Sequence, residues 1–114
     1  MAEACLFCKI VGAELDADIV FRSDQVVAFR DIDPVAPTHV LVVPTRHIRS
    51  AEELGPQDAA LLAEMFHVMG QVARDEGLRR GYRIVTNIGE DAGQSVDHLH
   101  FHVVGGRAMS WPPG

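Results

Sequence analysis

The chain has 114 residues, of which 47% are hydrophobic and 23% charged, and this length suits a single domain over residues 1–114. Its 10 Lys and Arg residues against 16 Asp and Glu give a formal net charge of −6, which opposes nucleic-acid binding. No apolar run approaches the ~20 residues of a membrane-spanning helix, and residues 1–4 lack the basic and apolar regions of a signal peptide. We therefore expect a cytoplasmic protein with neither a nucleic-acid nor a membrane partner.

The first half of the chain predicts a short helix followed by three strands. Apolar residues at helical spacing indicate a helix over residues 4–12, ending near Gly12. Two apolar runs, 19–22 and 26–30, are separated by three polar residues and predict a hairpin. Pro34 and Pro37 mark a loop over 31–37, and the apolar run 39–43, closed by Pro44, predicts a buried strand.

The second half predicts one long helix and two further strands. Apolar residues recur at three- and four-residue spacing from Leu61 to Ala73, after Pro56 and before an expected stop at Gly77. Residues 82–87 and 98–104 predict strands on either side of a Gly-containing loop over 89–95. Short connections favour antiparallel pairing. The fold class is thus α+β, a mostly antiparallel five-stranded sheet with the long helix on one face.

The last predicted strand alternates three histidines, His98, His100 and His102, with apolar residues. Alternation puts the imidazoles on one face and the apolar residues on the other, against the long helix. Imidazoles carry polar atoms that need partners, so they are poor core residues. One interpretation is a metal site of two histidines and a distant ligand, since His98 and His102 are about 13 Å apart along a strand. The other is nucleophilic attack on phosphorus by a neutral imidazole, assisted by its neighbours.

The loop before the triad favours the second interpretation. Gly93, Gln94 and Ser95 offer backbone N–H groups, an amide and a hydroxyl to anionic oxygens, and Asn87 adds a further donor. A small phosphorylated ligand therefore suits the chain despite its net negative charge.

The only two cysteines, Cys5 and Cys8, are one helical turn apart. In a reducing cytosol they are a metal half-site, a redox pair, or two buried thiols that pack with Phe7.

These motifs together resemble the histidine-triad (HIT) nucleotide-binding proteins, whose signature alternates three histidines with apolar residues. The resemblance covers nearly the whole chain, including the opening Cys5–Ile10 and the segment from Asp31 to Ile48. The run 93–95 and the tail with Gly105-Gly106-Arg107 and Trp-Pro-Pro-Gly resemble the Hint branch, the nucleoside phosphoramidases. Asp97 and Ser110 depart from vertebrate Hint proteins, which carry an aromatic residue and a histidine there, near the expected leaving-group side.

The resemblance implies a role for each matching residue. His100 would be the nucleophile, flanked by His98 and His102, and His39 would orient it. Asp31 would bind the ribose hydroxyls, with Ile32 against the base. Phosphate and leaving-group contacts would come from Asn87, Gly93, Gln94 and Ser95. Trp111 would lie near the active site of the partner in a homodimer whose sheets join into one.

The implied reaction is hydrolysis of a purine nucleoside 5′-phosphoramidate of the AMP or GMP type, through a nucleotidyl intermediate on His100 and without a cofactor. Two alternatives are a non-catalytic nucleotide-binding module that acts through a partner and a dinucleoside polyphosphate hydrolase, against which the Trp-Pro-Pro-Gly tail argues. Bacterial relatives also imply a structural zinc held by Cys5, Cys8, His47 and His98.

Overall fold

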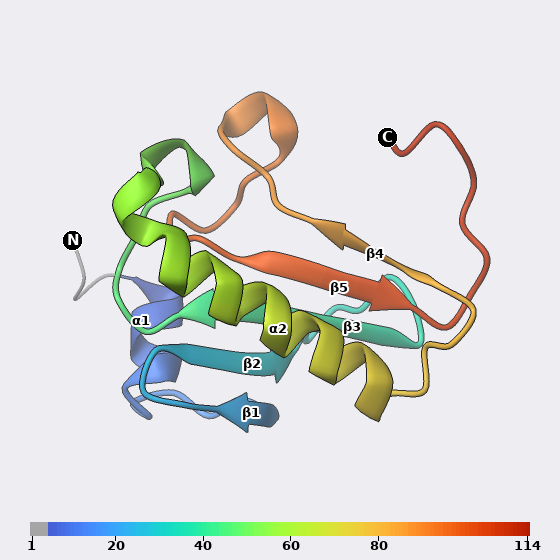
Figure 1. Ribbon diagram of the computed structural model, residues 1–114, viewed down its shortest axis with the longest axis horizontal. Coiled ribbons are helices and arrows are strands. Elements are labelled where there is room, and N and C mark those ends of the chain that lie inside the picture. Colours follow the sequence, from blue (N-terminus) through green and yellow to red (C-terminus); the bar gives the residue numbers. More distant parts are fainter. Residues whose placement is uncertain (1–4) are drawn as a thin grey trace.

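The structure is a computed structural model that describes residues 5–114, so the expectation about residues 1–4 lies outside the described part. The two α-helices and five strands, drawn in Figure 1, are α1 Leu6–Val11, β1 Ile19–Arg22, β2 Val26–Arg30, β3 Thr38–Pro44, α2 Ala59–Asp75, β4 Tyr82–Val85 and β5 Phe101–Gly105. Three short 3₁₀ turns lie at Ala51–Glu53, Pro56–Asp58 and Glu90–Ala92. In residues 5–114 we find no helix with the length and apolarity that a bilayer crossing requires.

The five strands form one antiparallel sheet in the order β1-β2-β3-β5-β4, as the predicted fold class requires. The predicted hairpin is present, with Arg22 opposite Val27. The strand β5 lies between β3 and β4, with Leu41 opposite His102 on one side and Val85 opposite His102 on the other. The histidine-bearing segment therefore enters the sheet near its centre, where neighbouring strands hold it on both sides.

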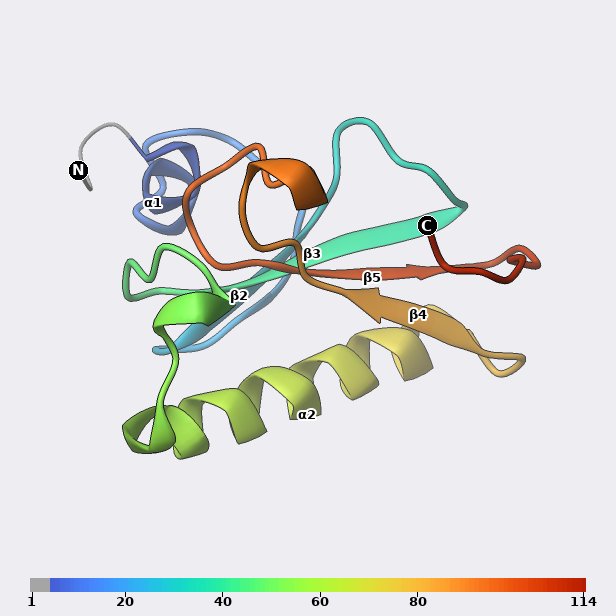
Figure 2. The same cartoon turned by 90° about the horizontal axis from the view of Figure 1, so that it is seen from above.

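Each face of the sheet is covered by one helix, α1 on one face and α2 on the other (Figure 2). On the α2 face the buried core joins alternate residues of the sheet to the apolar stripe of the helix: Val26, Ala28, Val40, Val42, Leu61, Met65, Val68, Met69, Val72, Leu99, Phe101 and Val103. On the other face, Cys5, Phe7 and Ile10 from α1 and its N-cap pack with the intervening sheet residues Val27, Phe29, Leu41 and Val43. The predicted alternation around the triad is thus confirmed, with its apolar residues against the long helix.

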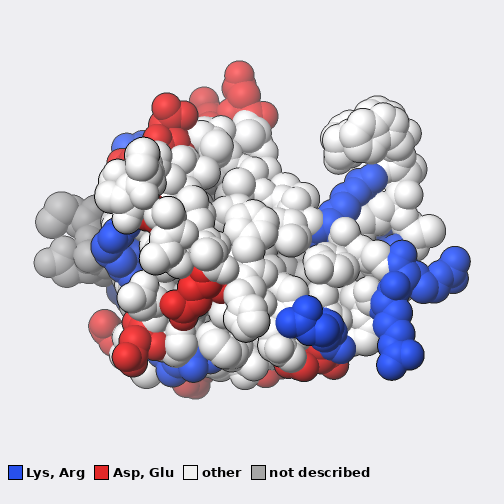
Figure 3. Space-filling view, in the orientation of Figure 1, with Lys and Arg blue, Asp and Glu red and all other residues white. Residues whose placement is uncertain are grey.

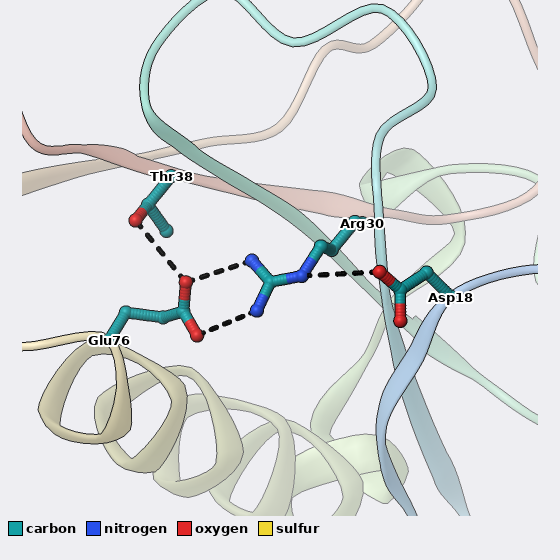
Figure 4. A network of polar contacts seen from close by, with 4 residues as sticks. All are labelled: Asp18, Arg30, Thr38 and Glu76. Atoms are coloured by element: carbon teal, nitrogen blue, oxygen red, sulfur yellow. Dashed lines mark hydrogen bonds and ion pairs between the residues drawn. The ribbon is translucent and has the colours of Figure 1, made fainter.

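An ion pair fastens the end of α2 to the strand β2 (Figure 4). The guanidinium of Arg30 donates to both carboxylate oxygens of Glu76, at 2.8 and 2.9 Å, and its Nε lies 3.4 Å from Asp18. The hydroxyl of Thr38 donates to the same Glu76 carboxylate at 3.3 Å. These contacts hold the pKa of Glu76 below its usual value, chiefly through the hydrogen bonds from Arg30.

Several predicted boundaries shift by a few residues. The last strand begins at Phe101 instead of His98, because the backbone N–H of Leu99 donates to the carbonyl of Ile48 at 2.6 Å and not to β3. The strand predicted over 82–87 ends at Val85. The long helix begins at Ala59, since Pro56 opens a separate 3₁₀ turn whose Asp58 carboxylate accepts from Gly55 N–H at 3.0 Å.

Candidate active site

His98 and His100 come just before β5 and His102 lies on it, on the face of the sheet that α1 covers (Figure 2). His98 and His100 are buried and His102 is half-buried. The ring of Phe7, from α1, meets His100 edge to face at 5.0 Å between centroids and also contacts His98 at 6.0 Å. Phe7 of the short helix therefore covers the rings of His98 and His100 and restricts how these rings can turn.

Backbone hydrogen bonds determine which nitrogen of His100 is free. Its Nδ1 lies 2.7 Å from the carbonyl oxygen of His98. A carbonyl can only accept, so Nδ1 carries the hydrogen and Nε2 keeps a lone pair in the neutral ring. The carbonyl of His100 in turn accepts from the hydroxyl of Thr86 at 2.8 Å. The residue thus presents a nucleophilic nitrogen on a ring that His98 orients, and its own carbonyl is held by Thr86.

A second chain of hydrogen bonds ends at His102. The backbone N–H of Val35 donates to Nδ1 of His39 at 3.2 Å, so the hydrogen of a neutral His39 is on Nε2. That Nε2 lies 2.8 Å from Nδ1 of His102 and 3.4 Å from a carboxylate oxygen of Asp31. Donation to His102 leaves the hydrogen of His102 on Nε2, a buried atom with no partner among residues 5–114. The interaction of His39 is thus with His102, and not with His100 as the resemblance implied.

Burial keeps the triad neutral. The pKa values of His98 and His100 are lowered from 6.5, in both cases mainly by loss of solvation. Loss of solvation, together with the nearby His100 and His39, lowers the pKa of His102 to about 4. Near neutral pH the ring of His100 therefore carries a lone pair suited to nucleophilic attack.

A cavity of about 330 Å³ opens beside His100 and His102. Most of its wall is apolar and comes from α1, the segment after it, β2 and β3: Leu6, Phe7, Ile10, Leu15, Ala17, Phe29 and Leu41. Polar groups stand at its edge, among them Asp16, Asp31 and Ser95. An apolar pocket with a few polar groups beside a free nucleophile suits a flat aromatic ligand that carries a reactive polar group.

A separate group of metal-ligating side chains lies on the other side of His98. Its Nε2–H donates to the carbonyl of Pro44 at 2.9 Å, so the lone pair of His98 is on Nδ1. That Nδ1 lies 3.3 Å from the sulfur of Cys5, 3.4 Å from the sulfur of Cys8 and 3.2 Å from Nδ1 of His47. Burial first, and then Cys5, raise the pKa of the Cys8 thiol to about 11.

The geometry of this group fits zinc. Bond lengths of about 2.0 Å to nitrogen and 2.3 Å to sulfur in a tetrahedron put ligand atoms about 3.3–3.8 Å apart. The ligand atoms of Cys5, Cys8, His47 and His98 all lie within 4.8 Å of one another. The other metal-type group in residues 5–114 is Asp31, His39 and His102, whose histidine nitrogens already bond to each other. Neither group contains two triad histidines, which disfavours the alternative of a metal centred on the triad.

The overall fold has counterparts among known proteins. The HIT domain profile matches residues 12–109. The chain belongs to the HIT domain family. An uncharacterized HIT-like protein of Synechococcus elongatus is 45% identical over all 114 residues and the full length of both chains. Solved structures of HIT family hydrolases from Legionella pneumophila and Clostridium thermocellum are also similar. The first is 46% identical with TM-score 0.95 over 96% of this chain and 99% of that one; the second is 42% identical with TM-score 0.92 over 95% of each.

The residues predicted for the site divide into two sets within this HIT fold. Five of them line the cavity together: Asp31, Ile32, Ser95, His100 and His102. Others lie outside it. The amide of Gln94 accepts from Gly89 N–H and donates to the carbonyls of Val96 and Arg49, so it stabilises its own loop and ties that loop to the segment of Arg49. Gly93 ends a 3₁₀ turn in the left-handed region, Asn87 is half-buried, and Trp111 is 82% exposed.

Some functional contacts had no signal in the sequence analysis. The hydroxyl of Thr86 and the N–H of Val35 act on histidines that are 14 and 4 residues away, through side chain and backbone atoms that no motif marks. The apolar cavity wall was also missed. Phe29 and Leu41 alternate along their strands with Ala28, Val40 and Val42, which pack against α2. This alternation could have indicated that Phe29 and Leu41 face the side of the sheet that carries the site.

Proposed function

We propose that this HIT protein is a hydrolase that cleaves purine nucleoside 5′-phosphoramidates through a nucleotidyl intermediate on His100. One observation carries the proposal. The free Nε2 of His100 and the hydrogen on Nε2 of His102 belong to rings that line the same cavity. Substitution at phosphorus needs a nucleophile that attacks the phosphorus and a donor that protonates the leaving group, and one cavity brings both groups to the same substrate.

In the first step, Nε2 of His100 attacks the phosphorus and forms a P–N bond to the enzyme as the substrate P–N bond breaks. The leaving amine takes a proton from Nε2 of His102, whose Nδ1 faces the hydrogen of His39. In the second step, water attacks the phosphorus and gives a proton to Nε2 of His102, which restores that ring, while the bond to His100 breaks and the free nucleotide leaves. The chain's own groups suffice for both steps, so the proposed catalysis uses no cofactor.

The cavity supports a purine nucleotide as the ligand. Its apolar wall offers a slot for a flat base, and Ile32 is exposed at the rim, where a base can cover it. One oxygen of Asp31 accepts from Asp33 N–H at 2.8 Å. The Asp31 carboxylate also lines the cavity, where it can accept hydrogen bonds from ribose hydroxyls. The HIT relatives with solved structures include proteins named histidine triad nucleotide-binding proteins.

The test compares an adenosine or guanosine 5′-phosphoramidate with a diadenosine polyphosphate on the same preparation. We expect release of the amine and the nucleotide from the phosphoramidate at a kcat/KM at least about a hundredfold higher. Preference for the diadenosine compound would instead identify a dinucleoside polyphosphate hydrolase. Tight nucleotide binding with no turnover of either substrate would identify a binding module.

A further inference from the structure

Five of the ten Lys and Arg residues gather at one end of this acidic chain, around the end of α2, the start of β4 and the C-terminal tail: Arg74, Arg79, Arg80, Arg83 and Arg107. Figure 3 shows blue groups gathered at this end, beneath and beside the tail. Such a concentration of positive charge is unexpected in a chain with a net charge of −6.

Three of these arginines line a cavity of about 420 Å³. Arg79 and Arg80 come from the loop between α2 and β4, and Arg107 follows β5. The backbone of both segments completes the wall, including Gly81 and Gly106. This volume lies within the range of small-molecule sites. None of its lining residues belongs to the cavity beside His100, so the two sites are separate.

The charges of this cleft are not neutralised by the protein. Within residues 5–114 the arginines that pair with carboxylates are Arg30, Arg46 and Arg49, all outside the cleft. The two acids at the end of α2 are already engaged: Asp75 accepts from the amide of Gln71 at 2.9 Å, and Glu76 holds Arg30. Positive charges without partners repel one another, so a bound anion would stabilise the arrangement.

Capping of α2 does not account for the arginines either. Basic residues often follow a helix to satisfy its last carbonyls. Here the backbone N–H groups of Glu76, Gly77 and Leu78 already donate to the carbonyls of Val72, Arg74 and Ala73. The side chains of Arg79 and Arg80 are both exposed and are left for another partner.

Arg107, the third arginine of the cleft, is held in place by the protein itself. Its Nε donates to the carbonyl of Val35 at 3.0 Å, and one Nη donates to the carbonyl of Ala108 at 3.2 Å. The preceding Gly106 has φ +93°, and a Cβ there would lie 3.0 Å from a side-chain carbon of Pro37. Only glycine suits this close approach, which brings Arg107 beside the loop of Arg79 and Arg80.

We propose that the cleft of Arg79, Arg80 and Arg107 binds a small phosphate-bearing polyanion of the di- or triphosphate type. A guanidinium offers a planar fork of N–H donors that matches phosphate oxygens, and fixed Arg107 lowers the entropy cost of binding. Three guanidinium groups suit a ligand with several adjacent negative charges better than a ligand with a single negative charge.

Residue-resolved NMR titration of the full chain with inorganic triphosphate tests this proposal. We expect saturable amide shifts at residues 79–81 and 106–108, with Kd on the order of 0.1 mM. Arg79→Gln combined with Arg80→Gln should weaken Kd at least about tenfold, whereas Arg22→Gln, an exposed arginine on β1, should leave Kd within about twofold. Shifts at Ser95 and His100 report the histidine site separately, so failure at either site is read independently of the other.

The same titration contains the outcomes that would overturn the proposal. Shifts that do not saturate, that sodium chloride of equal ionic strength reproduces, or that survive the double substitution would mean no site. Citrate has a comparable charge without phosphorus, and tighter binding of citrate would rule out phosphate as the preferred chemistry. Tighter binding of a single-stranded oligonucleotide at the same amides would assign the cleft to nucleic acid instead of a small ligand.

Discussion

The ring nitrogen Nδ1 of His100 donates to the carbonyl oxygen of His98 over 2.7 Å. The side chain of His98 points to a different group, because its Nδ1 faces Cys5, Cys8 and His47. His98 thus joins the nucleophile His100 to the cluster of candidate metal ligands. Its backbone orients His100, and its side chain anchors that backbone to α1 and the 45–50 loop.

Substitution of the nucleophile should separate binding from chemistry. We expect His100→Asn to lower kcat by about 10³-fold or more, while AMP binds within about threefold of the wild-type Kd, because the cavity wall is unchanged. Steady-state kinetics and calorimetry measure the two quantities, and mass spectrometry after acid quench should find the wild-type adduct on His100. Exposed His67, changed to Asn, is the matched control. A nucleotidyl adduct on another residue would contradict the assignment.

Loss of His39 should act on the leaving group through His102. We expect His39→Leu to lower kcat about 10–100-fold for substrates with a basic alkylamine leaving group, because His102 loses the partner of its Nδ1. An arylamine leaving group needs less protonation, so most of the loss should disappear with that substrate. An equal loss with both leaving groups would mean that His39 only supports the fold.

Metal removal should affect stability more than the chemical step. We expect about one zinc per chain in protein purified without affinity tags or chelators, and Cys5→Ser should lower Tm by about 5 °C or more. A chelator should lower the Tm of the wild type but not that of Cys5→Ser, while turnover at low temperature is largely retained. Metal-free protein of full stability would mean that the thiols only pack. Loss of the chemical step on chelation, with the fold intact, would point to a catalytic metal.

Acid should destabilise the fold in a defined pH window. The pKa of His102 is about 4 in the folded chain against 6.5 for the free side chain, so between these values the unfolded state binds more protons. The free energy of unfolding contributed by His102 is fully present above pH 6.5 and is lost as pH falls towards 4. The lowered pKa values of His98 and His100 act in the same direction. Urea unfolding from pH 7 to 4 measures the slope, which should be smaller for His102→Gln; an unchanged slope would refute the role of His102.

A homodimer, expected from the family resemblance, would cover an apolar strip on α2 and β4. Phe66 is 49% exposed and Ile84 is 36% exposed, and β4 is an edge strand. We expect a dimer by light scattering at micromolar concentration, and Phe66→Asp should raise its dissociation constant at least about thirtyfold, because it puts a charge into an apolar contact. Adjacent His67→Asp adds the same charge on the same helix as the control. A wild-type monomer would contradict the expectation and the role implied for Trp111.

The sequence by itself determined the elements and the face that carries the chemistry. A period of two in residues 98–103 separates histidines from Leu99, Phe101 and Val103, because side chains alternate across an extended backbone whatever its neighbours are. A period near 3.6 likewise defines α2 and its buried Met65 and Met69. Both patterns are local, so they can be read along the chain without knowing what packs against it.

Only the tertiary structure decided how the polar groups are partnered. His39 and His102 are 63 residues apart, and Cys5 and His98 are 93 apart, and each pair meets only because of how the sheet and α1 are arranged. The hydrogen on each ring depends on single backbone atoms, such as the N–H of Val35 and the carbonyl of Pro44. The sequence predicts the amide of Gln94 as a phosphate contact, whereas in the structure it bonds to the backbone of Gly89, Arg49 and Val96. A hydrogen bond acts over about 3 Å and in one direction, so its partner is defined by position in space and not by residue type.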